Sequence, residues 1–329
     1  MAALVALAVC LLVLHDWTIR LRSASPPERQ GESWLLPHDD FLLRLLPHRM
    51  ASVVRPLPAP YPVIDVHVHP WPTGDRFECL DLDALMDEMD GGGVEKIVLG
   101  VNARPPEVQP PIFSRREDEK VLEAYRRYPD RIIPALGGFD PEDPAAPAYV
   151  EAELKKGVWA AIAELDLWNE WKRTFYAPGD PVLTKIYRLA ARHGVPVLLH
   201  YSSSGDPSTA RGLDSALERV LRAHPETTFV MCHDCPDELL VLPNVWREFT
   251  LGTTAFPAEL ADRLVLGSDL QNPEGYANSG KHGAGAPYCE VVGELRAAMA
   301  CLPEAKRRLV ARENALRLFG GRGARRSGR

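Results

Sequence analysis

The sequence has neither a framework of paired cysteines nor a field of positive charge. Its six cysteines are scattered over 329 residues, so their spacing does not predict a disulfide-stabilised fold. Its 38 basic residues are outnumbered by 45 acidic ones, and the net charge of −7 argues against a nucleic-acid-binding protein. No G-x-G-x-x-G motif follows a strand-like run, which removes the usual signature of a dinucleotide-binding sheet.

Long hydrophobic runs are scarce, and one at the N-terminus is ambiguous. Residues 1–14 are almost wholly apolar, a length that is short for a transmembrane helix and suits the apolar part of a signal peptide. No basic residue precedes this run, whereas Arg20 and Arg22 follow it. We therefore interpret residues 1–22 as a signal-like or membrane-anchor segment, and membrane attachment, export and a cytoplasmic location all stay open. The sequence does not indicate the oligomeric state.

The remaining chain divides into a linker, one large domain and a short tail. Residues 23–60 are rich in proline and predict a linker, and residues 321–329 are basic and predict a disordered tail. Over residues 61–320, short apolar runs alternate with helical patterns. The predicted strands are 63–68, 96–101, 132–136, 159–165, 195–200, 228–232, 245–250 and 264–266. The helical patterns between them include 82–89, 117–128, 182–193 and 213–224.

This rhythm predicts an α/β fold. Eight strands with intervening helices over about 260 residues are typical of a (β/α)8 TIM barrel, and a doubly wound open sheet is the alternative. The first strand carries His67 and His69, whose side chains point the same way because strand residues alternate between faces. Two imidazoles held by one rigid strand make half of a divalent metal site.

Later strands end in residues of the same chemical kind. Reactive side chains of such a barrel lie at the carboxyl ends of its strands. The runs that follow end in Glu164 with Asp166, and in His200, His233 and Asp269. Four histidines and two or three carboxylates are therefore expected at one end of the barrel. The motif Cys232-His233-Asp234-Cys235 invites a redox or zinc-ribbon interpretation, but it lacks a thioredoxin-like setting and a second C-x-x-C.

With these residues in place, the chain resembles the amidohydrolase superfamily, close to its amidohydrolase-2-type (amidohydrolase-related) branch. The resemblance covers roughly residues 61–320 and rests on motifs along the whole barrel. These motifs are Ile64-Asp65-Val66-His67-Val68-His69, Gly138-Phe139-Asp140-Pro141, His200, His233, Gly267-Ser268-Asp269 and the closing segment from Glu313 to Gly320.

The resemblance implies a catalytic divalent metal. It implies that His67, His69 and His200 bind the ion and that Asp269 is both a ligand and a proton acceptor. Imidazoles with a carboxylate suit Zn²⁺, with Mn²⁺ or Fe²⁺ as alternatives. His233 is expected to polarise a substrate carbonyl, to act as an acid or base, or to bind a second ion. Glu164 occupies the place of a bridging ligand in two-metal relatives, so one or two ions are expected; the alternative is a salt bridge to Arg or Lys.

Other residues are expected around this centre. Asp65 precedes His67 by two residues, and we place it deeper in the barrel, where it supports a ligand. The candidates for substrate binding are Arg104, Trp168, Lys281 and His282.

The function expected from these residues is a metal-dependent hydrolase acting on a small amide, lactone or ester. The first alternative is a metal-dependent, non-oxidative decarboxylase of an aromatic or unsaturated acid, since that chemistry occurs in the same branch. The second is a catalytically silent, membrane-tethered binding protein on the same fold. In each case the expected partner is a small molecule.

Overall fold

The structure, a computed structural model, describes most of the predicted barrel. The described ranges are 61–69, 82–101, 115–169, 174–201, 207–233, 236–250, 258–272, 276–277 and 288–320. The predicted segments 1–22, 23–60 and 321–329 lie outside these ranges, as does any membrane attachment through the first of them. None of the helices within the described ranges is long and apolar enough to span a membrane.

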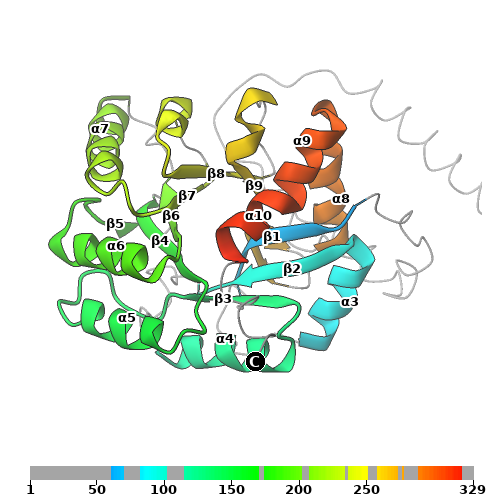
Figure 1. Ribbon diagram of the computed structural model, residues 1–329, viewed down its shortest axis with the longest axis horizontal. Coiled ribbons are helices and arrows are strands. Elements are labelled where there is room, and N and C mark those ends of the chain that lie inside the picture. Colours follow the sequence, from blue (N-terminus) through cyan, green and yellow to red (C-terminus); the bar gives the residue numbers. More distant parts are fainter. Residues whose placement is uncertain are drawn as a thin grey trace, which may run out of the picture. The chain divides into compact units, whose positions relative to one another are not determined.

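Strands and helices alternate along the chain (Figure 1). The eight strands of the barrel are β1 (Val63–Val68), β2 (Val94–Leu99), β3 (Ile132–Leu136), β4 (Ala161–Asn169), β6 (Val197–Tyr201), β7 (Phe229–Cys232), β8 (Val245–Phe249) and β9 (Leu264–Leu266). The helices between them are α3 (Leu82–Gly92), α4 (Arg115–Arg127), α5 (Ala146–Lys155), α6 (Pro181–His193) and α7 (Pro207–Ala223), with 3₁₀ turns η2 (Asp237–Val241) and η3 (Ala258–Arg263) before β8 and β9. The chain ends in α8 (Tyr288–Ala298), η4 (Met299–Cys301), α9 (Glu304–Arg308), a π-helical turn η5 (Leu309–Glu313) and α10 (Asn314–Phe319).

The predicted strands agree closely with the observed ones. The bounds of β1, β3 and β9 are as predicted, and those of the other five strands differ by one to four residues. The largest difference is in β4, which continues to Asn169 because its end pairs with the short antiparallel strand β5 (Thr174–Phe175). Glu164 therefore lies within a strand rather than at its end.

The eight strands form one parallel sheet that closes on itself. Their order is β1-β2-β3-β4-β6-β7-β8-β9. After β9, strand β10 (Leu270–Asn272), which pairs in turn with β11 (Tyr276–Ala277), pairs in parallel with β1. Val68 lies opposite Leu270, and the His69 N–H donates to the Leu270 carbonyl at 2.7 Å. This return to β1 confirms the predicted barrel and excludes the open sheet.

The two faces of the sheet pack into two different cores. Residues that face the helices form the larger, outer cluster, in which Val63 and Leu99 pack with Leu85 of α3 and Val292 of α8. The inner cluster fills the barrel and consists of Ile64, Val66, Val98, Ala135, Ala161, Ala163, Leu198, Val230, Cys232 and Val265, together with Ala315 and Phe319 of α10. The amide of Asn314 donates to the carbonyls of Ala261 and Leu264, where β9 begins. Helix α10 therefore closes the amino-terminal end of the barrel.

Local signals in the sequence explain where helices begin and end. The side chain of Asp180 accepts a hydrogen bond from the Val182 N–H at 2.7 Å, and Pro181 occupies the first turn of α6. The helix ends at Gly194, whose φ of 61° is the left-handed conformation that glycine adopts without a steric penalty.

Candidate metal centre

The two histidines of β1 meet inside the carboxyl end of the barrel. The Nε2 atoms of His67 and His69 lie 2.9 Å apart, and both side chains are almost fully buried. Two nitrogens bound to one tetrahedral zinc ion stand about 3.3 Å apart. The spacing of these two atoms therefore fits ligands of one cation, and the prediction that both point the same way is confirmed.

Strict alternation along β1 does not produce this arrangement. Asp65 pairs with Ile97 and Val68 with Leu99, so β1 advances three residues while β2 advances two. This extra residue is a β-bulge, which lets two consecutive residues, Val66 and His67, face the interior. Asp65 is left on the helix-facing side, where its carboxylate accepts from the Tyr288 hydroxyl of α8 at 2.7 Å.

The expectation that Asp65 lies deeper in the barrel is therefore wrong. Its carboxylate instead accepts from the backbone N–H of His67 and of Ser268, both at 3.0 Å, and from the Ser268 hydroxyl. Asp65 thus ties the bulge of β1 to the segment that follows β9. It supports the centre through the main chain and not through an imidazole ring.

The same device brings Glu164 into the barrel. Ile162 pairs with Val197 and Leu165 with Leu199, so β4 also carries one extra residue relative to its neighbour β6. Ala163 belongs to the inner cluster, and the next residue, Glu164, also faces the interior. The bulges in β1 and β4 therefore turn the side chains of His67 and Glu164 into the barrel, next to the apolar residues of the inner cluster.

His233 and Asp269 reach the centre through a different distortion of the backbone. Their φ angles are 62° and 51°, and they are the two non-glycine residues with positive φ in the described ranges. A side chain in this left-handed region costs roughly 1–3 kcal/mol and persists where the surrounding structure holds it. Such residues cluster at functional sites, so this strain marks both positions as functional candidates.

Glu164 lies among four imidazoles. Its Oε1 lies 2.8 Å from Nδ1 of His200, 3.3 Å from Nε2 of His233 and 3.4 Å from Nε2 of His67. Its Oε2 lies 3.4 Å from Nε2 of His69. The ion pairs of Glu164 within the described ranges are all with histidines, which disfavours the predicted alternative of an Arg or Lys partner.

Asp269 supplies a second carboxylate to the same histidines. Its Oδ1 lies 3.3 Å from Nε2 of His69 and 3.6 Å from Nε2 of His67, and its Oδ2 lies 3.8 Å from Nε2 of His233. The donors form three compact and overlapping groups, which are His67 with His69 and Asp269, Glu164 with His200 and His233, and His67 with Glu164 and Cys232. Oε1 of Glu164 lies within 3.4 Å of both His67 and His200, so the groups adjoin one another. That His67, His69, His200 and Asp269 share one ion stays a prediction.

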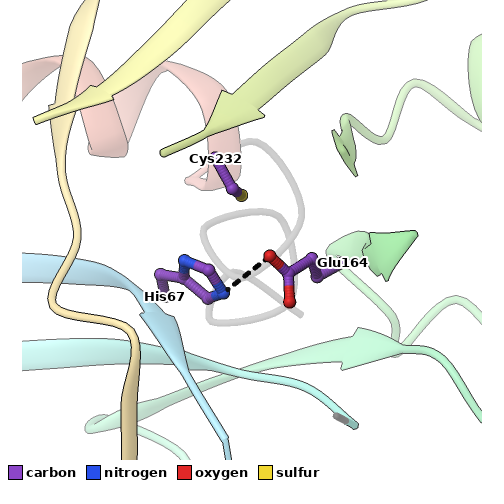
Figure 2. Close-up of side chains that lie close together, drawn as sticks. All are labelled: His67, Glu164 and Cys232. Atoms are coloured by element: carbon purple, nitrogen blue, oxygen red, sulfur yellow. Dashed lines mark ion pairs between the residues drawn. The ribbon is translucent and has the colours of Figure 1, made fainter. Parts of the chain in front are cut away.

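Cys232 lies beside these donors at the end of β7. Figure 2 shows its thiol and the side chains of His67 and Glu164 pointing toward a common point inside the barrel. Burial raises the pKa of the Cys232 thiol far above its ordinary value, so the group is a neutral thiol that belongs to the inner cluster. This placement agrees with its interpretation as a strand-end cysteine beside a functional histidine.

The second ring nitrogens of His67 and His69 point away from the centre and toward acceptors. Nδ1 of His67 lies 3.1 and 3.0 Å from the two carboxylate oxygens of Glu248, in β8. Nδ1 of His69 lies 3.2 Å from the Gly100 carbonyl oxygen. Both acceptors require a proton on Nδ1, so in its neutral form each ring carries its lone pair on Nε2, which faces the other ring. A divalent cation satisfies two facing lone pairs, so the donor set fits a metal.

Electrostatics in the centre are dominated by burial and by mutual pairing. Burial favours neutral groups, yet Glu248, Glu164 and Asp269 raise the pKa of His67 well above its usual value. Burial would raise the pKa of Glu164 and Asp269, but the surrounding histidines hold both well below their usual range. For His233, burial opposes protonation, while Glu164 and Asp269 raise its pKa to about 9. Without a bound cation, neighbouring charges rather than solvent favour the ionised forms of these groups.

Of the four predicted substrate-binding residues, the structure describes one, Trp168. Trp168 lies in β4, and its ring packs against Phe175 of β5 with centroids 4.3 Å apart, so it stands on a hairpin. Arg104, Lys281 and His282 lie outside the described residues. The substrate-binding role of all four stays a prediction.

A parallel (β/α)8 barrel with imidazole and carboxylate donors gathered at the carboxyl ends of its strands is the architecture of metal-dependent barrel enzymes. The chain belongs to the amidohydrolase family, whose profile matches residues 64–321. No curated protein matches the sequence significantly.

Solved structures with the same fold are distant in sequence. A TIM-barrel protein from Bordetella bronchiseptica is 19% identical with a TM-score of 0.56, covering 80% of this chain and 99% of that one. The 5-carboxyvanillate decarboxylase of Novosphingobium aromaticivorans, complexed with manganese, is 14% identical with a TM-score of 0.54, covering 79% and 96%. A probable 2-pyrone-4,6-dicarboxylic acid hydrolase from Acinetobacter baumannii is 17% identical with a TM-score of 0.54, covering 78% and 99%. At these identities the likeness establishes the fold.

Proposed function

We propose that the protein is a metal-dependent hydrolase that acts on a small amide, lactone or ester. The observation that carries the proposal is the pair of facing Nε2 atoms of His67 and His69, 2.9 Å apart, with the Asp269 carboxylate within 3.6 Å of both. When bound, a divalent cation supplies the Lewis acidity that lowers the pKa of a water and polarises a carbonyl. Family membership supports the same chemistry.

Asp269 and His233 have the properties of a base and an acid. Because the pKa of Asp269 is held low, its carboxylate is ionised at neutral pH and able to orient a water and accept its proton. His233, with a pKa of about 9 in the metal-free protein, is protonated at neutral pH and able to donate to a carbonyl oxygen or a leaving group. Each group shifts the pKa of the other, which leaves a carboxylate and an imidazolium close together in the metal-free protein.

The metal that suits these donors best is Zn²⁺. Imidazole nitrogens and a carboxylate oxygen suit zinc, and manganese or iron are alternatives; manganese is present in the decarboxylase structure from Novosphingobium aromaticivorans. His67, His69 and Asp269 would hold the first ion, and Glu164, Nδ1 of His200 and Nε2 of His233 would hold a second.

Metal stoichiometry of the parent and of Glu164→Gln decides between one and two ions. A fall from two equivalents of metal in the parent to one in Glu164→Gln would support two metal ions bridged by Glu164. One equivalent in both proteins would establish a single ion and leave His233 free for acid–base work.

A decarboxylase of an aromatic or unsaturated acid is the second candidate. Decarboxylases of 5-carboxyvanillate and of 2,6-dihydroxybenzoate are among the solved structures with this fold. Such an enzyme uses the metal to hold the acid and needs no attacking water. It also needs cationic groups for the carboxylate, and Arg104 and Lys281 are the candidates in the sequence. The silent binding protein is disfavoured because the donor set in the described ranges is intact.

One panel of substrates separates the two enzymes. Zinc-loaded and manganese-loaded protein is incubated with simple amides, lactones and esters, monitored by acid release, and with hydroxybenzoates, monitored by release of CO₂. We expect metal-dependent hydrolysis that chelation abolishes. Release of CO₂ without hydrolysis would instead establish the decarboxylase, and the absence of both activities would favour the binding protein.

A further inference from the structure

Glu248 is a buried carboxylate that contacts two residues of the centre from outside it. It lies in β8, and its side chain is fully buried. Both carboxylate oxygens lie within 3.1 Å of Nδ1 of His67, and Oε2 also accepts from the His233 N–H at 3.1 Å. One side chain thus contacts two of the strands that carry candidate ligands.

The backbone around Glu248 is shaped to admit it. A β-carbon at Gly267 would overlap the Glu248 carboxylate, so only glycine at this position leaves room for it. Gly267 follows β9 directly and precedes Asp269 by two residues. The carboxylate therefore occupies a space bounded by the ends of β1, β7 and β9.

We propose that Glu248 is a positioning residue of the metal centre, which acts through His67 by holding its proton on Nδ1 and its Nε2 lone pair toward the ion. The inference rests on the proposed metal site. A buried carboxylate is costly unless it is paired, and the Nδ1–H of His67 is the side-chain donor that pairs with it. An acceptor on the second nitrogen of a metal-binding histidine fixes ring orientation and increases ligand basicity.

His69 provides an internal reference for this inference. Its Nδ1 donates to the Gly100 carbonyl, a neutral backbone group that no side-chain substitution removes. Loss of the Glu248 charge should therefore act on His67 and spare His69. A purely structural role would disturb both rings or neither.

The test measures zinc binding and ring protons in Glu248→Gln, which keeps the side-chain shape and removes its charge. We expect zinc affinity, measured by competition with a chromophoric chelator, to fall about 10- to 100-fold. In the zinc-loaded protein, the Nδ1–H proton signal of His67 should shift in the NMR spectrum while that of His69 stays. Glu117→Gln, a buried glutamate on α4, is the matched control and should leave zinc affinity unchanged.

The outcomes separate this inference from the function it rests on. A parent protein that binds no zinc contradicts both. A parent that binds zinc, with a Glu248→Gln variant of equal affinity and an unchanged His67 signal, overturns the role of Glu248 alone. If Glu248→Gln fails to fold, Gly267→Ala displaces the carboxylate while keeping its charge, and it should weaken zinc binding to a similar degree; unchanged affinity there overturns the inference.

Discussion

The two ends of the barrel are built on opposite principles. At the amino-terminal end, apolar residues such as Ile64, Ala161 and Leu198 pack against Ala315 and Phe319 of α10. At the carboxyl end, buried imidazoles and carboxylates face one another, and two of these residues have strained backbone. The first arrangement stabilises the fold, whereas the second gathers groups that are costly to bury.

The difference shows where the chain departs from local rules. Along the inner face, apolar residues follow the two-residue alternation of a strand, and so does His200 after Leu198. His67 and Glu164 depend on bulges, and His233 and Asp269 depend on positive φ angles. Local irregularity is thus concentrated on candidate functional residues, the pattern expected when stability is exchanged for function.

The largest expected effect lies at the amino-terminal end. Phe319→Ala removes a buried ring from the inner cluster and should lower the free energy of unfolding by about 3–5 kcal/mol, measured by urea denaturation. Zinc affinity of the folded protein should not change, because α10 lies at the other end. Phe319→Leu should lose far less stability. A folded Phe319→Ala protein with weakened zinc binding would break the separation of the two ends.

Asp118 is a buried carboxylate outside the metal centre, and its effect on stability is expected to depend on pH. Asp118 accepts from the N–H groups of Gly137 and Gly138 and from the Tyr149 hydroxyl, and burial raises its pKa from 3.8 to about 6. Because the folded state binds this proton more tightly than the unfolded state, stability falls as pH rises from about 4 to about 6, by roughly 3 kcal/mol.

Asp118→Asn should remove this part of the pH dependence. Urea denaturation of parent and variant between pH 4 and 7 measures it, since other titrating groups cancel in the difference. Parallel stability curves for the two proteins would show that Asp118 is not held with a raised pKa.

Activity is expected to respond most at Asp269. Asp269→Asn keeps the shape of the side chain but removes its charge and basicity, so turnover should fall about 10²-fold or more. Asparagine also tolerates the left-handed backbone conformation at this position, so the variant should fold. Steady-state kinetics of the metal-loaded proteins measures the effect. Near-normal turnover would remove Asp269 from the mechanism.

The smallest effect is expected at Asp180, a helix-capping residue that lies outside the metal centre and the inner cluster. Asp180→Ala removes the N-cap of α6 and should lower the free energy of unfolding by about 1 kcal/mol, while Asp180→Ser should be close to neutral. Thermal or urea denaturation measures both, and zinc affinity should not change in either. A loss of zinc binding in Asp180→Ala would contradict the claim that only the residues of the metal centre bind zinc.

Much of the fold and of the site follows from the sequence. Apolar runs and their spacing predict eight strands, and the rule that reactive residues lie at the carboxyl ends of barrel strands selects His67, His69, His200, His233 and Asp269. Alternation alone, however, places Asp65 and His67 on one face. The bulge that separates them depends on the pairing of β1 with β2, which no local pattern encodes.

Glu248 shows a second limit of sequence reasoning. It follows Arg247 in a short strand, where neighbouring opposite charges suggest a solvated edge. One signal for Glu248 exists in the sequence. It lies two residues after Trp246, and residues two apart in a strand share a face, so both face the interior of the barrel. Its pairing with His67, 181 residues earlier, becomes visible only when the barrel closes.

The central claim is that the carboxyl end of this barrel binds a divalent metal through His67 and His69. Elemental analysis of the protein dialysed against zinc, with unfolding curves of the same samples, tests it most directly. We predict at least one equivalent of metal per chain in the parent and in His193→Ala, a histidine at the end of α6, and one equivalent fewer in the folded His67→Ala/His69→Ala variant. A metal content in that double variant equal to that of the parent would contradict the claim.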